Sequence, residues 1–181
     1  MSAVVLGLGN VLMLDDGVGA AAVVELGRRY RLPEEVTLLD GGVLGLHLVG
    51  LLADADSVLV LDAVRAGGAP GTPARLEGAA VHARYAARIS PHEVGFTEVL
   101  ATAAVHARTP RRLVVHGVEP ERVGPGVGLS APVAAALDRL VDAAAAELRA
   151  WGLQVRPRDD PEPAGPYPDG VLGLTAARSG A

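Results

Sequence analysis

Acidic residues and one histidine stand near the ends of separate predicted elements in this 181-residue chain. Asp15 and Asp16 lie shortly after an apolar run, Asp62 directly follows another, and His92 lies in the first turn of a predicted helix. Carboxylates and an imidazole together suit nickel, zinc, manganese or iron, and three protein ligands leave positions open for a substrate or water. If the segments meet, they predict a metal site built from two carboxylates and one imidazole.

Each of these residues also has a purely structural interpretation. Asp15 and Asp16 precede a predicted helix, where N-capping alone favours aspartate. Asp62 at a strand end fits an Asx turn, and a histidine at the positive end of a helix is by default neutral and solvated. His116 lies in a predicted strand and is a reserve ligand. The convergence of three segments on one edge is what favours the metal site.

Two glycine-containing loops could take part in the same chemistry. Asn10 is the only asparagine of the chain, and its side chain is expected to hold the turn after Gly9 by bonding to the backbone. In the Asp40-Gly41-Gly42 segment, glycine allows a positive φ or the close approach of another backbone. A substrate peptide could occupy that space, or the glycines could serve only the conformation of the turn.

Strand patterns alternate with helix patterns along the chain. Short apolar runs predict strands, and apolar residues at helical spacing predict helices, of which the last follows an N-cap at Ser130 and ends at Gly152. The predicted strands are 3–8, 36–39, 57–61, 74–77 and 113–118, and the predicted helices are 16–30, 44–52, one opening at Ser90-Pro91-His92-Glu93, and the one from Ser130.

This alternation predicts a single α/β domain over residues 1–156, with a twisted, mostly parallel central sheet and helices on both faces. Ligands bind such sheets beyond the carboxyl ends of the strands, where the strand order reverses. If the first and third strands are neighbours, the residues following Leu8 and Leu61 share that crevice. Residues 157–181 contain five of the chain's 13 prolines and are expected to be a solvated, disordered tail that the fold does not need.

Composition excludes several classes of protein. The chain has no cysteine and no lysine, which excludes disulfides, thiolate ligands, Schiff-base chemistry and a P-loop. A net charge of −5 gives no reason to expect nucleic acid or an anionic membrane as partner, and no apolar stretch is long enough to cross a bilayer. Without a recognisable secretory signal at the start, we expect a cytoplasmic protein. A dinucleotide fingerprint is disfavoured because Leu12 occupies its third glycine position.

Five sequence motifs, in order and with matching spacing, resemble the maturation endopeptidases of nickel-iron hydrogenases. The resemblance runs from residue 3 to about residue 156, and Gly117-Val118-Glu119-Pro120 and Gly128-Leu129-Ser130 add weaker support. The five motifs are Gly7-Leu8-Gly9-Asn10-Val11-Leu12, Asp15-Asp16-Gly17-Val18-Gly19, Leu39-Asp40-Gly41-Gly42, Leu61-Asp62-Ala63 and Ser90-Pro91-His92-Glu93.

The resemblance implies an endopeptidase that removes a C-terminal extension from the hydrogenase large-subunit precursor after nickel insertion. It maps the metal-contacting residues onto Asp16, Asp62 and His92, and the nickel would be supplied by the precursor, with cadmium or zinc as substitutes in crystals. It implicates Asp40 in cleavage or substrate recognition. The candidate catalytic residues are therefore Asp16, Asp40 and Asp62, and Asn10, Gly41 and Gly42 form the candidate substrate loop.

The chain departs from the family pattern at two positions. Asp16 stands where relatives often have glutamate, which leaves open whether Asp15 also binds the metal. Val43 stands where many relatives have threonine or serine.

The missing hydroxyl at Val43 supports an alternative function, a non-cleaving escort that senses nickel in the precursor. A third interpretation is a nucleotide-binding or other small-ligand protein. For the protease, attack by metal-bound water and general-base action by an aspartate both stay open. We expect a monomer that binds the precursor transiently.

Overall fold

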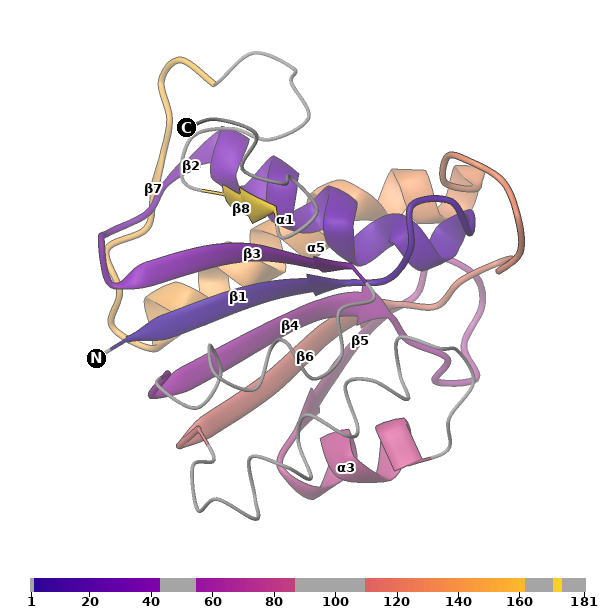
Figure 1. Cartoon of the computed structure of the whole chain (residues 1–181), viewed down its shortest axis with the longest axis horizontal. Helices are drawn as coiled ribbons and strands as arrows, with labels where there is room; N and C mark the ends of the chain where they lie inside the picture. The colour runs from indigo at the N-terminus through magenta and orange to yellow at the C-terminus, as the bar shows by residue number, and fades with distance from the viewer. Residues whose placement is uncertain (1, 43–54, 87–109, 162–170, 174–181) are drawn as a thin grey trace, which may run out of the picture.

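The structure, a computed structural model, describes residues 2–42, 55–86, 110–161 and 171–173 (Figure 1). Strands and helices alternate through most of this range. In chain order they are β1 (Ala3–Leu8), a 3₁₀ helix η1 (Asp15–Gly17), α1 (Val18–Arg29), β2 (Tyr30–Arg31), β3 (Val36–Gly42), β4 (Ser57–Ala63), β5 (Pro73–Glu77), α3 (Ala79–Ala86), β6 (Arg112–Val118), α5 (Ala131–Ala150), β7 (Arg156–Pro157) and β8 (Val171–Gly173).

The described strands form a six-stranded sheet in the order β5-β6-β4-β1-β3-β8. Strand β1 lies in the middle and pairs in parallel with β3 on one side and β4 on the other, while β5 is antiparallel to β6. The predicted, mostly parallel sheet is confirmed, and the first and third predicted strands are neighbours, which is the condition on which the shared crevice depended. The strand order therefore reverses at β1, which makes the carboxyl end of β1 the place where a ligand crevice is expected.

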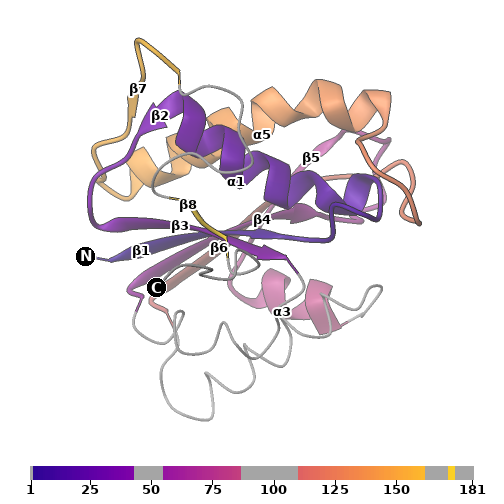
Figure 2. The same cartoon turned by 45° about the horizontal axis from the view of Figure 1, so that its top comes forward.

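Helices cover both faces of the sheet, as predicted. Helices α1 and α5 pack side by side on one face, and α3 lies on the other (Figure 2). Because side chains alternate across a strand, the strands of the central sheet contribute side chains to two hydrophobic cores, one on each face. The core under α1 and α5 includes Val5, Leu59, Leu61 and Leu148, and the core on the α3 face includes Leu6, Val60, Val115 and Tyr85.

Helix α5 forms as its apolar stripe predicts. Val133, Leu140, Val141 and Leu148 are buried, and Gly152 follows the helix with a φ of 90°, a conformation that favours glycine. Ser130 occupies the N-cap position, but its side chain makes no capping bond to the helix. The expected hydroxyl cap is therefore wrong, and the hydroxyl has a different partner, described below.

Parts of the segment beyond residue 156 are paired with the domain. Strand β7 pairs antiparallel with β2, the N–H of Arg158 donates to the Arg29 carbonyl at 2.8 Å, and β8 pairs in parallel with β3. The expectation of a wholly solvated tail is wrong for these residues. Pro157 can occupy β7 because an outer strand position does not require its missing N–H. The domain boundary itself stays a prediction.

Two predicted helices, 44–52 and the one opening at Ser90, lie outside the described residues, together with His92 and Val43. Within the described parts, no helix is both long and apolar enough to span a membrane.

Candidate active site

Helix α1 begins directly against the carboxyl ends of β1 and β4. A side chain at Gly19 would place its Cβ 2.2 Å from the Leu61 carbonyl oxygen and 2.3 Å from that of Leu8. Real Cβ atoms do not approach so closely, so only glycine allows the helix to sit at this depth. The preceding turn η1 is thereby held against β4, and the loop that carries Asp16 meets the strand that carries Asp62.

The loop after β1 fixes the position of Asp16. Gly9 has a φ of 110°, and a Cβ there would lie 1.7 Å from the backbone oxygen of Asp16. The N–H of Asn10 donates to Asp16 Oδ2 at 2.8 Å. Asp16 is almost fully buried, with 5% of its surface exposed. The carboxylate is therefore held at the end of β1 by a neutral backbone donor.

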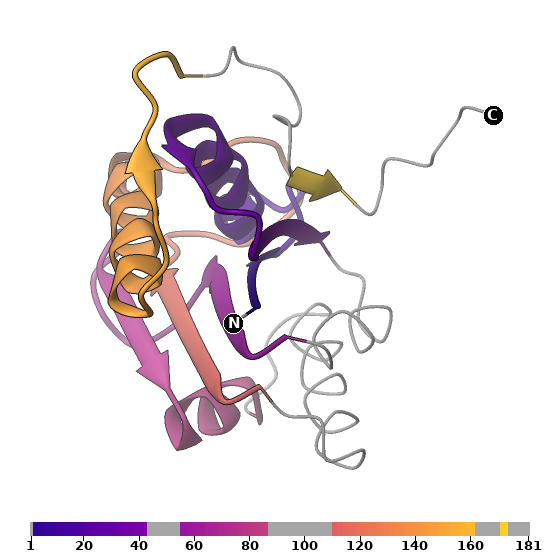
Figure 3. The same ribbon diagram turned by 90° about the vertical axis from the view of Figure 1, so that its left-hand side faces the viewer.

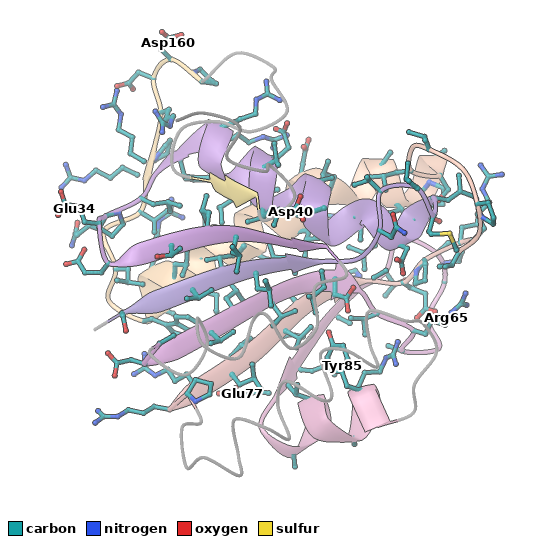
Figure 4. All side chains as sticks on the ribbon, in the orientation of Figure 1. Glu34, Asp40, Arg65, Glu77, Tyr85 and Asp160 are labelled. Atoms are coloured by element: carbon teal, nitrogen blue, oxygen red, sulfur yellow. The ribbon has the colours of Figure 1, made fainter. Side chains whose placement is uncertain are left out.

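Asp62 lies near the carboxyl end of β4 and is fully buried. Its Oδ1 accepts the N–H of Ala63 at 2.8 Å, and its Oδ2 accepts the hydroxyl of Tyr85 at 2.8 Å. Leu61 faces the α1/α5 core, so alternation along the strand directs Asp62 to the α3 face. Figure 4 shows Tyr85 on that side of the sheet, reaching from α3. The bond to the next amide lies within β4 and is not the Asx turn considered from the sequence, in which the side chain bonds to the amide two residues on.

Tyr85 is a site residue that the sequence analysis missed. It is buried, with 1% of its surface exposed, and its ring packs in the core of the α3 face. The signal that could have revealed it is weak: Val81 and Tyr85 are four residues apart, a spacing that places both on one side of a short helix. Nothing in the sequence connects that hydroxyl to Asp62.

Asp15 points away from Asp16 and holds a different loop. Its Oδ2 accepts the N–H groups of Glu121 and Arg122 and the Ser130 hydroxyl at 2.8–3.0 Å, and its Oδ1 accepts the Ser130 N–H at 2.6 Å. Burial acts to raise the pKa of Asp15, but these hydrogen bonds outweigh it and hold the pKa below its ordinary value. Asp15 caps neither η1 nor α1. These contacts make Asp15 a structural residue, which argues against a share in metal binding.

Glu119 fixes the loop after β4 in the same way, by accepting backbone N–H groups. This buried carboxylate accepts the N–H of Ala66 at 2.7 Å and that of Gly68 at 3.1 Å, both through Oε2. The Gly117-Val118-Glu119-Pro120 motif thus ties the end of β6 to the connection that follows β4. The carboxyl edge of the sheet is consequently a set of loops fixed by buried acids.

The Asp40-Gly41-Gly42 segment ends β3, next to β1. Asp40 Oδ1 accepts the N–H of Gly42 at 3.1 Å, and the Gly42 carbonyl accepts the N–H of Gly9 at 3.3 Å. Figure 4 shows Asp40 on the α1 side of the sheet, opposite to Tyr85. Asp40 therefore shares the carboxyl edge with Asp16 and Asp62, but it leaves the sheet on the other face from Asp62. Its catalytic role stays a prediction.

Asn10 behaves as its sequence context predicts. Its side-chain oxygen accepts the N–H of Leu12 at 3.0 Å, and its backbone oxygen accepts the N–H of Met13 at 2.9 Å. The side chain thus holds the turn by bonding to the backbone. Leu12, at the third position of the dinucleotide pattern, is 61% exposed on this loop, and α1 begins six residues later, too far along the chain for a phosphate-binding turn.

His116 lies on the opposite side of the sheet from Asp62. It pairs with Leu61 across the β4–β6 ladder, and its Nε2 lies 2.9 Å from Glu147 Oε2 on α5. The structure therefore does not bring this reserve ligand to Asp62. Among the described residues no three histidine or acidic side chains are close enough together to hold a metal. Since His92 lies outside those residues, the ligand set of Asp16, Asp62 and His92 stays a prediction.

Comparison with known proteins identifies the family. Residues 20–147 match the family model for hydrogenase maturation protease. The chain belongs to the hydrogenase maturation protease family. The hydrogenase 2 maturation protease of Escherichia coli is 37% identical over 160 residues, which cover 88% of this chain and 98% of that protein. The hydrogenase expression/formation protein HoxM of Azotobacter vinelandii is 40% identical, over 91% of this chain and 81% of its own length.

Solved structures of hydrogenase maturation proteases have the same fold. The hydrogenase maturating endopeptidase HybD of Escherichia coli superposes with a TM-score of 0.85 at 37% identity, covering 88% of this chain and 99% of that one. The [NiFe] hydrogenase maturation protease HybD of Thermococcus kodakarensis gives a TM-score of 0.66 at 26% identity, over 80% of this chain and 97% of that one. Peptidase activity in hydrogenase maturation is thus the established activity of the family to which this chain belongs.

Proposed function

We propose that this chain removes the C-terminal extension of a nickel-loaded [NiFe] hydrogenase large-subunit precursor. Asp16, Asp62 and His92 contact the precursor's nickel, which belongs to the substrate and not to the enzyme. The observation that supports the proposal most directly is the meeting of η1 and β4, because it delivers two buried aspartates to the edge where β1 reverses the strand order.

The environment of the two aspartates suits contact with a cation. Asp16 accepts a hydrogen bond from a backbone amide, and Asp62 accepts hydrogen bonds from a hydroxyl and a backbone amide. These hydrogen bonds fix the direction of each carboxylate. A carboxylate pair with one imidazole fits nickel or zinc. The soft ligands come from the precursor, since this chain has no cysteine.

Nickel contact would place the extension across the carboxyl edge of the sheet. Orientation of this kind turns a slow encounter between two chains into a reaction within one complex. Tyr85 acts as a positioning residue, because its hydroxyl donates a hydrogen bond of 2.8 Å to Asp62 Oδ2. The cytoplasmic location and the monomeric state stay predictions, which cell fractionation and size-exclusion chromatography test.

The experiment is incubation of the purified chain with nickel-loaded and nickel-free precursor, followed by mass measurement of the large subunit. We expect a shorter subunit with the nickel-loaded precursor only. Asp62→Asn and His92→Ala should each slow processing at least about 100-fold, on the order of what loss of a group that stabilises charge costs. Asp160→Asn, an exposed acid far from this edge in Figure 4, is the matched control.

Two results would contradict the proposal. A stable complex with nickel-loaded precursor and no shortened subunit would make the chain a nickel-sensing escort. Undiminished processing and unchanged nickel affinity in Asp62→Asn and His92→Ala would remove the nickel contacts while leaving the peptidase activity in place.

A further inference from the structure

The outer edge of β3 already carries a segment of the chain's own tail. Strand β8 pairs in parallel with β3 at Leu38↔Val171, Leu39↔Leu172 and Asp40↔Gly173. Figure 3 shows β8, the yellow arrow, as the outermost strand beside β3. The other side of β3 is occupied by β1, which pairs with it from Val36 to Gly42. The edge thus accepts an extended peptide through its backbone groups.

The pairing with β8 is short. Three residues of β8 take part, and a backbone hydrogen bond contributes only about 0.5–1.5 kcal/mol to stability in water. Without β8, the same groups would form an open edge, which is the surface that proteins use to bind extended peptides by strand addition. A short strand attached to its own chain can therefore be displaced by a competing peptide that is anchored elsewhere.

The position of this edge connects it to the candidate active site. β8 pairs with β3 as far as Asp40, whose side chain holds the Gly42 amide beside Gly9. The loop that begins at Gly9 carries Asp16. A peptide lying along β3 would therefore have one end at the carboxyl edge of the sheet, at the residues proposed to contact nickel.

We propose that Leu38–Asp40 of β3 is the docking strand for the C-terminal extension of the precursor, and that Val171–Gly173 occupies the same positions until the extension displaces it. The proposal rests on the proposed function for the identity of the peptide. The precursor, anchored by its nickel, presents its extension at a high effective concentration and displaces β8. The tail strand lowers the apparent affinity for precursor by the fraction of molecules in which it occupies the edge.

The test uses the full-length chain with Val171→Pro/Leu172→Pro, which removes two backbone N–H groups from β8. The matched control is Ala176→Pro/Ala177→Pro, which makes the same change in the chain beyond Val171–Gly173. We expect faster amide hydrogen exchange in the peptide covering residues 36–42 of the β8 variant, and no change in the control. Equal amide exchange rates for residues 36–42 in the unmodified chain, the β8 variant and the control would show that β8 does not occupy the edge of β3.

The second measurement is binding of a fluorescent synthetic peptide with the sequence of residues 167–177. If β8 fills the edge in nine molecules of ten, the peptide should bind the β8 variant about tenfold more tightly than the unmodified chain. Nickel-loaded precursor should displace this peptide from the β8 variant. Failure of the precursor to displace it would overturn the docking strand.

Processing kinetics complete the test. The β8 variant should show a severalfold lower KM for precursor with an unchanged kcat, and the peptide should inhibit it competitively. Precursor that displaces the peptide but is never shortened would refute the proposed function and leave the docking strand standing. Normal processing with an unchanged or raised KM in the β8 variant would refute the docking strand and leave the proposed function standing.

Discussion

Each face of the central sheet carries a carboxylate, partly buried on one face and fully buried on the other, and the two carboxylates are held in different ways. On the α5 face, Glu147 accepts two hydrogen bonds from Arg75 at 2.9 Å, lies 2.9 Å from His116 Nε2, and accepts the Trp151 Nε1–H at 3.1 Å. On the α3 face, Asp62 accepts bonds from a tyrosine hydroxyl and a backbone amide. One acid is bound to a cation of its own chain, whereas the donors named for the other are neutral.

Glu147 is a structural acid. The hydrogen bonds from Arg75 lower the pKa of Glu147 to about 2, against the opposing effect of burial and with a further contribution from His116. The charge of Glu147 is therefore already compensated by Arg75. Through Arg75 and His116, Glu147 connects α5 to β5 and β6. Glu147 is held in place by a cation, whereas the structural acids Asp15 and Glu119 are held by backbone amides.

The largest effect on stability should follow Glu147→Gln. The change leaves the guanidinium of Arg75 against a neutral side chain, and loss of one member of a partly buried ion pair should cost about 2–3 kcal/mol in the free energy of unfolding. Urea denaturation measures it, and the rate of precursor processing per folded molecule should stay the same. Glu77→Gln, which removes the exposed partner of the same arginine, is the control and should cost less than about 0.5 kcal/mol. Loss of processing by folded Glu147→Gln would break the distinction between the faces.

The lowered pKa of Glu147 predicts an acid dependence of the same stabilisation. A group whose pKa is lower in the folded state stabilises the protein above its unfolded pKa, here 4.5, and loses that contribution as the pH falls towards about 2. The stability difference between the unmodified chain and Glu147→Gln should therefore shrink by about 2 kcal/mol across this window. Urea titrations at pH 6 and pH 3 give the two differences. A gap that does not change with pH would show that the stabilisation does not depend on the charge of Glu147.

Tyr85→Phe sharpens the comparison from the other face. Loss of the hydroxyl removes one of the bonds that orient Asp62, so we expect about a tenfold slower processing step and weaker nickel contact, with a cost of about 1 kcal/mol in stability. Tyr30→Phe is the matched control, because the Tyr30 hydroxyl donates to the exposed Asp142 at 2.8 Å on the α5 side. Equal losses of processing in both variants would indicate a general effect of removing a hydroxyl, and would leave Tyr85 without a positioning role.

The smallest effect should follow His116→Gln. Glutamine can still donate to Glu147, and His116 faces α5, so processing and nickel affinity should change less than about twofold. A calorimetric nickel titration beside the processing assay checks both. A large loss of nickel affinity would restore His116 as a ligand and contradict the assignment of the two faces.

The fold could be predicted from the sequence because its signals are local and repeated. The apolar runs around Val5, Leu59 and Val115 are continuous, as in strands covered on both faces, and the stripe of α5 has helical spacing up to Gly152. The two-residue β2 and β7 carry no such signal. The pairing of β8 with β3 could not be predicted either, because proline and glycine in the tail indicate a lack of regular structure.

The site could be predicted only as far as chain segments meeting at an edge. Parallel strands bring Gly9 and Asp62 to the same edge of any such sheet, so their proximity follows from the strand order. The roles of Asp15 and Asp16 could not be separated, because adjacent acids before a helix have the same local pattern. Their difference depends on a loop more than 100 residues later, whose amides reach Asp15. The partnership of Tyr85 with Asp62 is equally non-local.

The contact of Gly19 with the carbonyl oxygens of Leu8 and Leu61 limits how this protein can be redesigned. Even a methyl group there would push α1 off the strands and carry Asp16 away with it. Room for new side chains lies instead in the loop after β1, where Val11 and Leu12 are exposed.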